Sequence, residues 1–167
     1  TEVIPASKWN DCNEPYRVAP DPIIRVGICQ PYKREYWNVN VNKMEIDESL
    51  TNEDVFNDSG LYIQVKAYVL SRQINRTKVA QVSENKAEWK EDFTFENGDF
   101  WGLTHAFQLT LYKEDGTWLG DTDMIYPEEI EVCNQDYQLM LTFPYMIDNN
   151  LRQGLKLNVT FTKKGCL

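Results

Sequence analysis

The four cysteines are the residues whose chemistry the sequence defines most clearly. Cys12, Cys29, Cys133 and Cys166 form an even set without a Cys-x-x-Cys pair, so neither a zinc site nor a thioredoxin-like motif is indicated. Widely spaced cysteines in even number are typical of structural disulfides formed in an oxidising compartment. Four cysteines allow three connectivities. Their placement near the two ends favours, among these, Cys12 with Cys166 and Cys29 with Cys133.

Catalytic chemistry has little support elsewhere in the chain. The single histidine, His105, lies between Gly102 and an expected strand, where a structural or surface role is commoner than that of a base. The sequence contains no Gly-x-Ser-x-Gly, Walker or His-Glu-x-x-His motif, and oxidised cysteines leave no nucleophilic thiol. Paired acids carry little weight in a chain with 26 Asp and Glu residues. We therefore expect a protein that is not an enzyme and needs no cofactor.

Three features predict export. Asn57, Asn75 and Asn158 each begin an Asn-x-Ser/Thr sequon, the acceptor for N-linked glycans. The sequence starts at Thr1 rather than Met, which fits a removed signal peptide and equally fits a trimmed chain. With the disulfides, these features predict a secreted, extracellular glycoprotein. No apolar run approaches the roughly 20 residues that a membrane span needs, so no transmembrane segment is expected.

The charge excludes some partners. The net charge of -9 repels a phosphate backbone, so nucleic acid is not an expected partner. The same charge opposes docking to an anionic membrane. It suits instead a basic protein partner, met by the acidic stretch from Asp47 to Asp58.

Five side chains are candidates for contact with a hydrophobic ligand: Phe100, Trp101, Trp118, Tyr145 and Met146. Phe100 and Trp101 stand between glycines in a turn composition, so at least one ring is a candidate for exposure. Trp118 follows the Asp-Gly-Thr turn, where an apolar tip can enter a pocket or a membrane. The competing interpretation is that these rings cap the core. A lipid or other hydrophobic small molecule is the expected partner, and a protein partner is the alternative.

The elements that would position these residues are mostly strands. Residues 1–35 hold five prolines and two cysteines, which predicts an extended arm pinned by disulfides. From residue 36 onward, alternating segments predict about eight strands: residues 36–46, 61–70, 76–82, 92–96, 106–116, a short one in 117–127, 137–146 and 154–162. An acidic loop lies between the first two, and a short helix is expected at 127–132. The sequence predicts an all-β antiparallel sandwich over residues 36–167.

The stretch from Thr77 to Glu96 raises a particular problem. Trp89, Glu91, Phe93 and Phe95 share one face by their spacing of two, which would bury Glu91 with the aromatic rings. We therefore expect the strand to begin near Asp92, and a bend before it to bring the Trp89 side chain to the same face. The aromatic rings themselves are expected to pack in the core.

This stretch also resembles a known family. Thr77, Lys78 and Val79, followed by Asn85 and by Trp-x-Glu-x-Phe-x-Phe from Trp89 to Phe95, are similar to the middle of a C2 domain. The segments FQLTLYKEDG, Trp118-Leu119-Gly120 and GLKLNVTF extend the resemblance, so that it covers about residues 36–162. It implies a C2-like β-sandwich with loops at one end.

Members of the C2 family bind calcium through aspartates on these loops, and calcium needs six to eight oxygen ligands. Here Gly60 and Lys113 stand where the family has aspartate, and Asp115 alone matches. We expect no high-affinity calcium site, and hence no metal.

A second resemblance concerns the two ends. Trp9-x-x-Cys12, Pro20-Asp21-Pro22-Ile23-Ile24 and Gly165-Cys166 are similar to the ML lipid-recognition family, whose members are secreted β-sandwiches that hold a lipid between their sheets. The middle of the chain does not fit that family. Both resemblances imply a β-sandwich that binds lipids.

Overall fold

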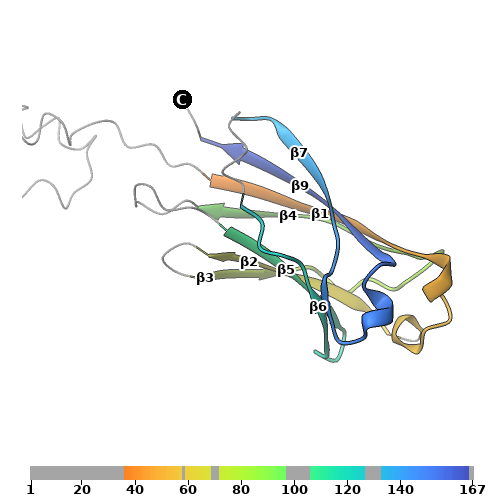
Figure 1. Cartoon of the computed structure of the whole chain (residues 1–167). Coiled ribbons are helices and arrows are strands. Elements are labelled where there is room, and N and C mark those ends of the chain that lie inside the picture. Colours follow the sequence, from red (N-terminus) through yellow and green to blue (C-terminus); the bar gives the residue numbers. More distant parts are fainter. Residues whose placement is uncertain (1–35, 58, 69–71, 97–105, 127–132, 166–167) are drawn as a thin grey trace, which may run out of the picture. The chain divides into compact units, whose positions relative to one another are not determined.

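The structure, a computed structural model, describes residues 36–57, 59–68, 72–96, 106–126 and 133–165. They belong to one compact unit, residues 35–166, which is built of strands and short 3-10 helices (Figure 1). The strands are β1 (Tyr36–Ile46), β2 (Leu61–Tyr68), β3 (Arg72–Arg76), β4 (Lys86–Glu96), β5 (Ala106–Lys113), β6 (Trp118–Asp121), β7 (Asp136–Leu141), β8 (Tyr145–Met146) and β9 (Leu155–Lys164); the 3-10 helices are η3 (Glu48–Leu50), η4 (Asp54–Phe56) and η6 (Asn149–Leu151). The predicted arm 1–35 and helix 127–132 lie outside the described residues.

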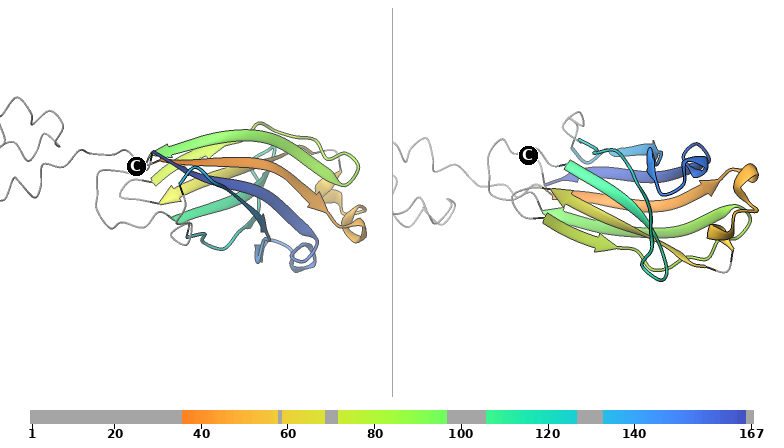
Figure 2. Two further views of the ribbon diagram at one scale, coloured as in Figure 1. Left: turned by 90° about the horizontal axis from the view of Figure 1, so that it is seen from above. Right: turned by 60° about the horizontal axis from the view of Figure 1, so that its bottom comes forward.

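The strands form two antiparallel sheets that face each other (Figure 2). One sheet has the order β4-β1-β9-β7 and the other the order β3-β2-β5-β6-β8. Every strand pair in both sheets is antiparallel. The predicted all-β antiparallel sandwich is confirmed for this part of the chain, with nine strands in place of about eight.

Strand β1 shows the alternation that its sequence predicts. Trp37, Val39 and Val41 are buried, whereas the asparagines that alternate with them lie on the outer face. β1 pairs with β4 on one side and β9 on the other, so a strand with one apolar face is held at the centre of its sheet. Burying side chains of this size stabilises the fold by about 1.5–3 kcal/mol each.

The core lies between the sheets and is rich in aromatic rings. Phe107 of β5 contacts rings from the opposite sheet: Phe95 with centroids 5.5 Å apart and Phe161 at 5.4 Å. Trp37 lies 6.3 Å from the same ring in an edge arrangement. These rings are all buried, so the sheets are joined by close aromatic packing.

The β4 strand differs from its prediction. It runs without interruption from Lys86 to Glu96 rather than from Asp92, and it is accommodated by a β-bulge, where Asn42 of β1 faces both Trp89 and Lys90. Lys90 has a positive φ of 51°. The expected bend before Trp89 is therefore a bulge inside the strand, a local irregularity that raises strand twist without ending the pairing.

Trp89 and Glu91 join the two sheets at one side of the sandwich. The indole Nε1 of Trp89 donates to the carbonyl of Leu61 on β2 (3.1 Å), and the backbone N–H of Lys78 donates to Glu91 Oε2 (2.7 Å). The edge strands β3 and β4 therefore lie on the same side, which we call the β3–β4 side. Glu91 is tolerated beside core aromatics because its carboxylate has a backbone donor there.

Two further strand predictions were wrong in their bounds. A strand was predicted at 76–82, whereas β3 covers Arg72–Arg76. Beyond it, the N–H of Thr77 donates to the Ile63 carbonyl (2.9 Å) and Ala80 forms an isolated bridge to Leu61. Thr77 turns the chain, because its Oγ1 accepts from the N–H of Ile63 (3.0 Å). The strand predicted at 137–146 is divided into β7 and β8, which belong to different sheets. Pro144 lies just before β8, and because proline has no backbone N–H, it cannot donate a hydrogen bond to a neighbouring strand.

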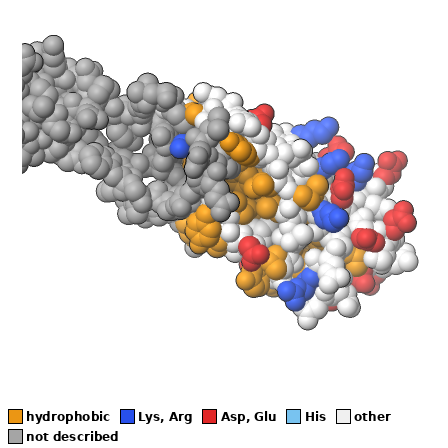
Figure 3. All heavy atoms as spheres, turned by 45° about the horizontal axis from the view of Figure 1, so that its top comes forward, with side chains coloured by type: hydrophobic (Ala, Val, Ile, Leu, Met, Phe, Trp, Pro, Cys, Tyr) orange, Lys and Arg blue, Asp and Glu red, His pale blue; other side chains and the backbone are white. Residues whose placement is uncertain are grey.

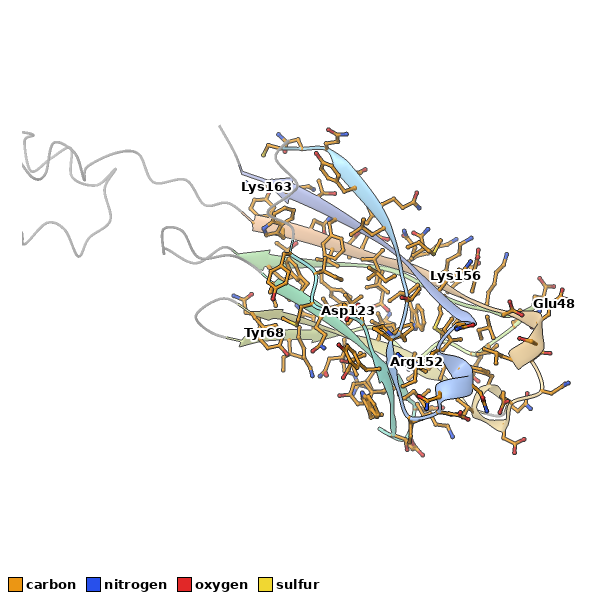
Figure 4. The ribbon with its side chains drawn as sticks, in the orientation of Figure 1. Glu48, Tyr68, Asp123, Arg152, Lys156 and Lys163 are labelled. Atoms are coloured by element: carbon orange, nitrogen blue, oxygen red, sulfur yellow. The ribbon has the colours of Figure 1, made fainter. Side chains whose placement is uncertain are left out.

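The connection from β1 to β2 contains η3 and η4, each of which buries one apolar residue, Leu50 and Phe56. Glu48 marks this end of the sandwich, and Tyr68 and Lys163 mark the opposite end (Figure 4). The predicted acidic loop is thus anchored to the core by its apolar residues. Among the described residues, no helix has the length and apolar character to cross a membrane.

Candidate functional site

Three of the side chains predicted to contact a ligand lie on neighbouring strands. Trp118 is the first residue of β6, and Tyr145 and Met146 make up β8. The two strands pair, with Asp121 opposite Tyr145. Residues far apart in the sequence are therefore brought to one edge of the five-stranded sheet.

The position of the Trp118 ring is fixed by a hydrogen-bonded neighbour. Its Nε1 donates to Asp121 Oδ1 (3.2 Å), and the same oxygen accepts from the hydroxyl of Thr110 on β5 (2.6 Å). Thr110 is buried, whereas Trp118 is 37% exposed. A buried residue thus orients a carboxylate, and the carboxylate orients an exposed indole, which reduces the entropy lost when a ligand contacts the ring.

The three residues from Tyr145 to Ile147 alternate between the surface and the interior. Tyr145 is 57% exposed and Ile147 is 59% exposed, while Met146 packs against the core. A Cβ placed on Gly120 would lie 2.1 Å from Met146 Sδ, so this glycine provides the room for the methionine. Met146 therefore anchors β8, and its two neighbours supply the exposed apolar surface.

Several exposed apolar residues lie on or near β6, β7 and β8. β7 and β8, the edges of the two sheets, are joined by residues 142–144, and Phe143 in that link is fully buried. We call this the β7–β8 side. Of the seven large apolar residues that are exposed in the described part of the chain, Trp118, Tyr145 and Ile147 lie on or beside the paired strands β6 and β8. Met140 is on β7 opposite Asn158, so it lies on the outer face of the other sheet, and Met124 and Tyr126 flank Ile125, which bridges to Phe107. The seventh, Ile74, lies on β3 at the far edge.

The space-filling view in Figure 3 shows an uneven surface of another kind, which changes from one end of the sandwich to the other. On the face shown in Figure 3, hydrophobic side chains gather toward one end and charged side chains toward the other. Monomeric soluble proteins scatter single apolar residues over their surface, whereas a concentration on one side is typical of an interaction site.

An aromatic row beside Trp118 was missed by the sequence analysis. Tyr62 and Tyr112 are directly opposite each other on β2 and β5 and stack with centroids 5.2 Å apart. Arg76 covers the other face of Tyr62, with Cζ 4.6 Å from the ring centroid, and Tyr112 pairs with Trp118. The row lies on the outer face of the five-stranded sheet. The tyrosines alternate with core residues in the sequence, and this alternation was the signal available.

The end of the sandwich that carries η3 holds carboxylates with local partners. The backbone N–H of Ser49 donates to Asp47 Oδ1 (2.9 Å) and lowers the pKa of that carboxyl. Hydrogen bonds from the hydroxyl and backbone N–H of Thr117 likewise lower the pKa of Asp115. Within the described ranges, no group of three or more His, Cys, Asp or Glu residues has the arrangement to hold a metal ion.

Gly60 has a packing role at the position where the C2 family carries aspartate. A Cβ on this residue would lie 2.1 Å from Val79 Cγ1 and 2.8 Å from Gln81 Nε2. The carbonyl of Gly60 also accepts from the N–H of Glu114 (2.8 Å), which ties the β1–β2 connection to the β5–β6 turn. An aspartate side chain therefore has no room here in the present packing.

Several predicted residues lie outside the described part of the chain: Phe100, Trp101, His105, Cys12, Cys29 and Cys166. Cys133 is described and has no free thiol, while the predicted pairings stay predictions. Of the three sequon asparagines, Asn57 and Asn75 are exposed, whereas Asn158 is 9% exposed.

Comparison with known proteins bears on the fold. No family model matches the sequence, and no curated protein matches it. The structure is similar to a C2 domain-containing protein from a putative elicitor-responsive gene, with a TM-score of 0.57 and 16% identity over 80% of this chain and 92% of that one. It is also similar to a C2 domain of plant extended synaptotagmin 1, with a TM-score of 0.53 and 18% identity over 79% and 95% of the two chains.

A third similar structure is human GIVD cytosolic phospholipase A2, with a TM-score of 0.58 and 14% identity. The match covers 80% of this chain and only 18% of the phospholipase, so it concerns one part of that enzyme. The resemblance of the termini to the ML family is not supported, since its residues are almost all outside the described ranges and no family model matches. At these identities the likeness concerns the fold, and the described part of the chain is a C2-like β-sandwich.

Proposed function

We propose that this chain is an exported, non-enzymatic binding module that holds a lipid or other hydrophobic ligand on its β7–β8 side. The observation that carries the proposal is that Trp118, Tyr145 and Ile147, three of the seven large apolar residues exposed in the described part of the chain, lie together on or beside the paired strands β6 and β8. Contact with acyl chains would remove these side chains from water, which is favourable by about 25 cal/mol per Å² of apolar surface. The net charge of -9 favours a neutral or zwitterionic ligand over an anionic one.

Trp118 and Ile147 are the two side chains expected to contribute most. The indole is large and already oriented by Asp121, and the isoleucine is the most exposed of the seven, at 59%. The row formed by Arg76, Tyr62 and Tyr112 adjoins Trp118 and offers phenol hydroxyls and a guanidinium for the polar part of an amphipathic ligand.

The test is sedimentation with phosphatidylcholine vesicles. Replacing Ile147 or Trp118 by Gln should weaken binding about tenfold or more, since burial of such a side chain contributes about 1.5–3 kcal/mol. Ile74→Gln is the matched control, because Ile74 is also exposed, at 43%, but lies on β3. Equal losses for Ile74→Gln and Ile147→Gln would contradict the assignment of this side.

A tightly held ligand calls for a separate measurement. Native mass spectrometry of protein purified from its source, followed by organic extraction, should release a stoichiometric hydrophobic molecule if the module is a carrier. Protein that carries no hydrophobic molecule and does not bind phosphatidylcholine vesicles would overturn the proposal.

A protein partner is the second candidate, and the acidic end supports it. Asp47 and Asp115 are exposed and held in place by hydrogen bonds from Ser49 and Thr117, so their charges are presented in fixed positions. A basic partner would bind with an affinity that falls as salt rises. Affinity capture from the source at low and high salt, with Asp47→Asn and Asp115→Asn as comparisons, tests this candidate.

Export with two disulfides is part of the proposal. Cys133 without a free thiol supports it, and the favoured pairs remain Cys12 with Cys166 and Cys29 with Cys133. Mass measurement after alkylation without reduction should show four protected cysteines. Alkylation of all four without reductant would place the chain in a reducing compartment instead.

A further inference from the structure

The three sequon asparagines occupy different environments in the fold. Asn57 follows η4 and is exposed, Asn75 is exposed on β3, and Asn158 is 9% exposed within β9. Because a glycan is bulky and hydrated, it needs an asparagine whose Nδ2 opens to solvent. The folded structure therefore distinguishes sites that the sequence pattern treats alike.

Asn158 is engaged in the outer face of the four-stranded sheet. Its Oδ1 accepts from Asn42 Nδ2 (2.7 Å) and from Gln138 Nε2 (3.0 Å). The sequon hydroxyl, Thr160 Oγ1, accepts from the same Asn42 amide (3.2 Å). These bonds hold the Asn158 amide against the sheet between Asn42 and Gln138. Because the residue is only 9% exposed, a bulky sugar on its Nδ2 has little access to solvent.

Asn75 is located at an open edge. β3 is the outermost strand of its sheet and pairs only with β2 among the described strands. Asn75 is opposite the buried Val65, so both side chains lie on the inner face of the sheet. Because β3 is the edge strand, Asn75 lies at the margin of the core and its side chain is exposed. The neighbouring Ile74 is 43% exposed. An exposed edge strand with an apolar residue is a template for pairing with another chain unless something covers it.

We propose that Asn75 carries an N-linked glycan that caps the open edge of β3, and that Asn158 remains unmodified. The inference rests on the proposed export, which brings the chain to the glycosylation machinery. In the reaction, Asn75 Nδ2 bonds to the anomeric carbon of the first sugar of a lipid diphosphate-linked oligosaccharide. The bond from that carbon to the diphosphate oxygen breaks, the lipid diphosphate leaves, and Nδ2 loses one proton.

The glycan would lie far from the apolar part of the proposed ligand site. Arg76, assigned above to the polar part, is the next residue after Asn75, but it is opposite Gln64 whereas Asn75 is opposite Val65, so the two side chains lie on opposite faces of β3. β3 and β8 are the two edges of the same sheet, separated by four strand spacings of about 4.8 Å, or roughly 19 Å. One edge is then covered by a hydrated sugar while the other stays open to a ligand. Protection of the β3 edge and ligand binding at the β8 edge are thereby separated in space.

The first test is the mass of the secreted protein. The full chain is expressed behind a cleavable signal peptide in a eukaryotic host, as wild type, Asn75→Gln and Asn158→Gln, and weighed before and after treatment with peptide N-glycosidase. We expect Asn75→Gln to lose one glycan and Asn158→Gln to lose none. A glycan on Asn158, or an unchanged glycan mass in Asn75→Gln, would overturn the assignment.

The second test is self-association, measured by light scattering over a range of concentrations. Asn75→Gln should show an apparent mass that rises toward that of a dimer, because its β3 edge is uncovered. Asn57→Gln is the control, since that asparagine follows η4 rather than lying on an edge strand. If Asn75→Gln remains as monomeric as the wild type, the edge does not need a cap.

Failure of this inference can be told apart from failure of the proposed function. Asn75→Gln should keep its binding to phosphatidylcholine vesicles, since the β7–β8 side is unchanged. Protein from its natural source that has oxidised cysteines but no glycan would overturn the glycan on Asn75 and leave export standing. Protein with free thiols and no glycan would overturn both.

Discussion

At the scale of single residues, Trp89 connects the two sheets by a hydrogen bond as well as by packing. Its Nε1 donates to the carbonyl of Leu61 (3.1 Å), and the side chain is only 9% exposed. Trp89→Phe should lower the free energy of unfolding by about 0.5–1.5 kcal/mol, because one hydrogen bond between the sheets is lost while the Leu61 carbonyl keeps the N–H of Ala80 as a donor (2.9 Å). Urea denaturation followed by circular dichroism measures this change.

Trp118→Phe is the control for that substitution. It removes an indole N–H from an exposed ring, whose partner Asp121 keeps the donor from Thr110. We expect a loss below about 0.5 kcal/mol, as for most surface substitutions. If both variants unfold at the same urea concentration, the bond from Trp89 does not contribute to stability.

The sequence predicted that Trp89 is buried but not its partner. The alternation of Trp89, Phe93 and Phe95 indicated a core face, and Trp89 and Phe95 are buried, with Phe93 partly so. Nothing in the sequence places the Leu61 carbonyl at the indole, since that contact depends on the spacing of the two sheets. The bulge at Lys90 could not be predicted either, because a positive φ (51°) usually indicates glycine and the residue here is lysine.

At the scale of elements, β8 is a two-residue strand whose attachment depends on Gly120. A Cβ there would lie 2.1 Å from Met146 Sδ and 2.8 Å from the carbonyl oxygen of Tyr145. Gly120→Ala should therefore displace β8 and lower the free energy of unfolding by about 1–3 kcal/mol. Hydrogen exchange should show faster exchange at Ile147, whose N–H donates to Leu119 (2.8 Å).

A second variant separates the two clashes. In Gly120→Ala with Met146→Ala, the sulfur is gone but the backbone oxygen of Tyr145 remains close. We expect the double variant to have a lower free energy of unfolding than Met146→Ala alone, because the clash with the Tyr145 carbonyl oxygen remains. Full recovery of β8 protection in the double variant would show that the flexible methionine alone imposes the requirement for glycine.

Strand alternation predicted the central elements better than the edges. The sequence identified β1, β2, β5 and β9, because strands with one buried face must alternate. It missed the bounds of β3 and did not separate β7 from β8, because edge strands have fewer buried positions and therefore a weaker pattern. The candidate contacts Trp118, Tyr145 and Met146 were identified by residue type, while their proximity depends on the pairing of β6 with β8.

At the scale of the whole molecule, stability should fall in acid. The folded state lowers the pKa of Asp47 and Asp115 below the ordinary 3.8. A carboxyl with a lowered pKa stabilises the fold above its unfolded pKa, and this contribution is lost as the pH falls through the folded value. Both groups are exposed, so the individual contributions are small.

Asp47→Asn with Asp115→Asn should lower the urea midpoint near pH 7 and make the decline toward about pH 3 shallower. Glu48→Gln is the matched control, because it removes an exposed carboxylate from the same end without removing a cap. In a chain with net charge -9, relief of repulsion alone would raise the midpoint in all variants. Such a uniform rise would contradict a capping role for Asp47 and Asp115.

The pairing of the first and last strands has a mechanical consequence. β1 and β9 are antiparallel neighbours, and Tyr36 at the start of one is directly opposite Lys164 at the end of the other. Tension applied through these two strand ends would load the outermost rung of the ladder alone and then each rung in turn, like a zipper. The sandwich would thus open under low force along this direction, although the same hydrogen bonds pulled lengthwise would share the load and resist it together.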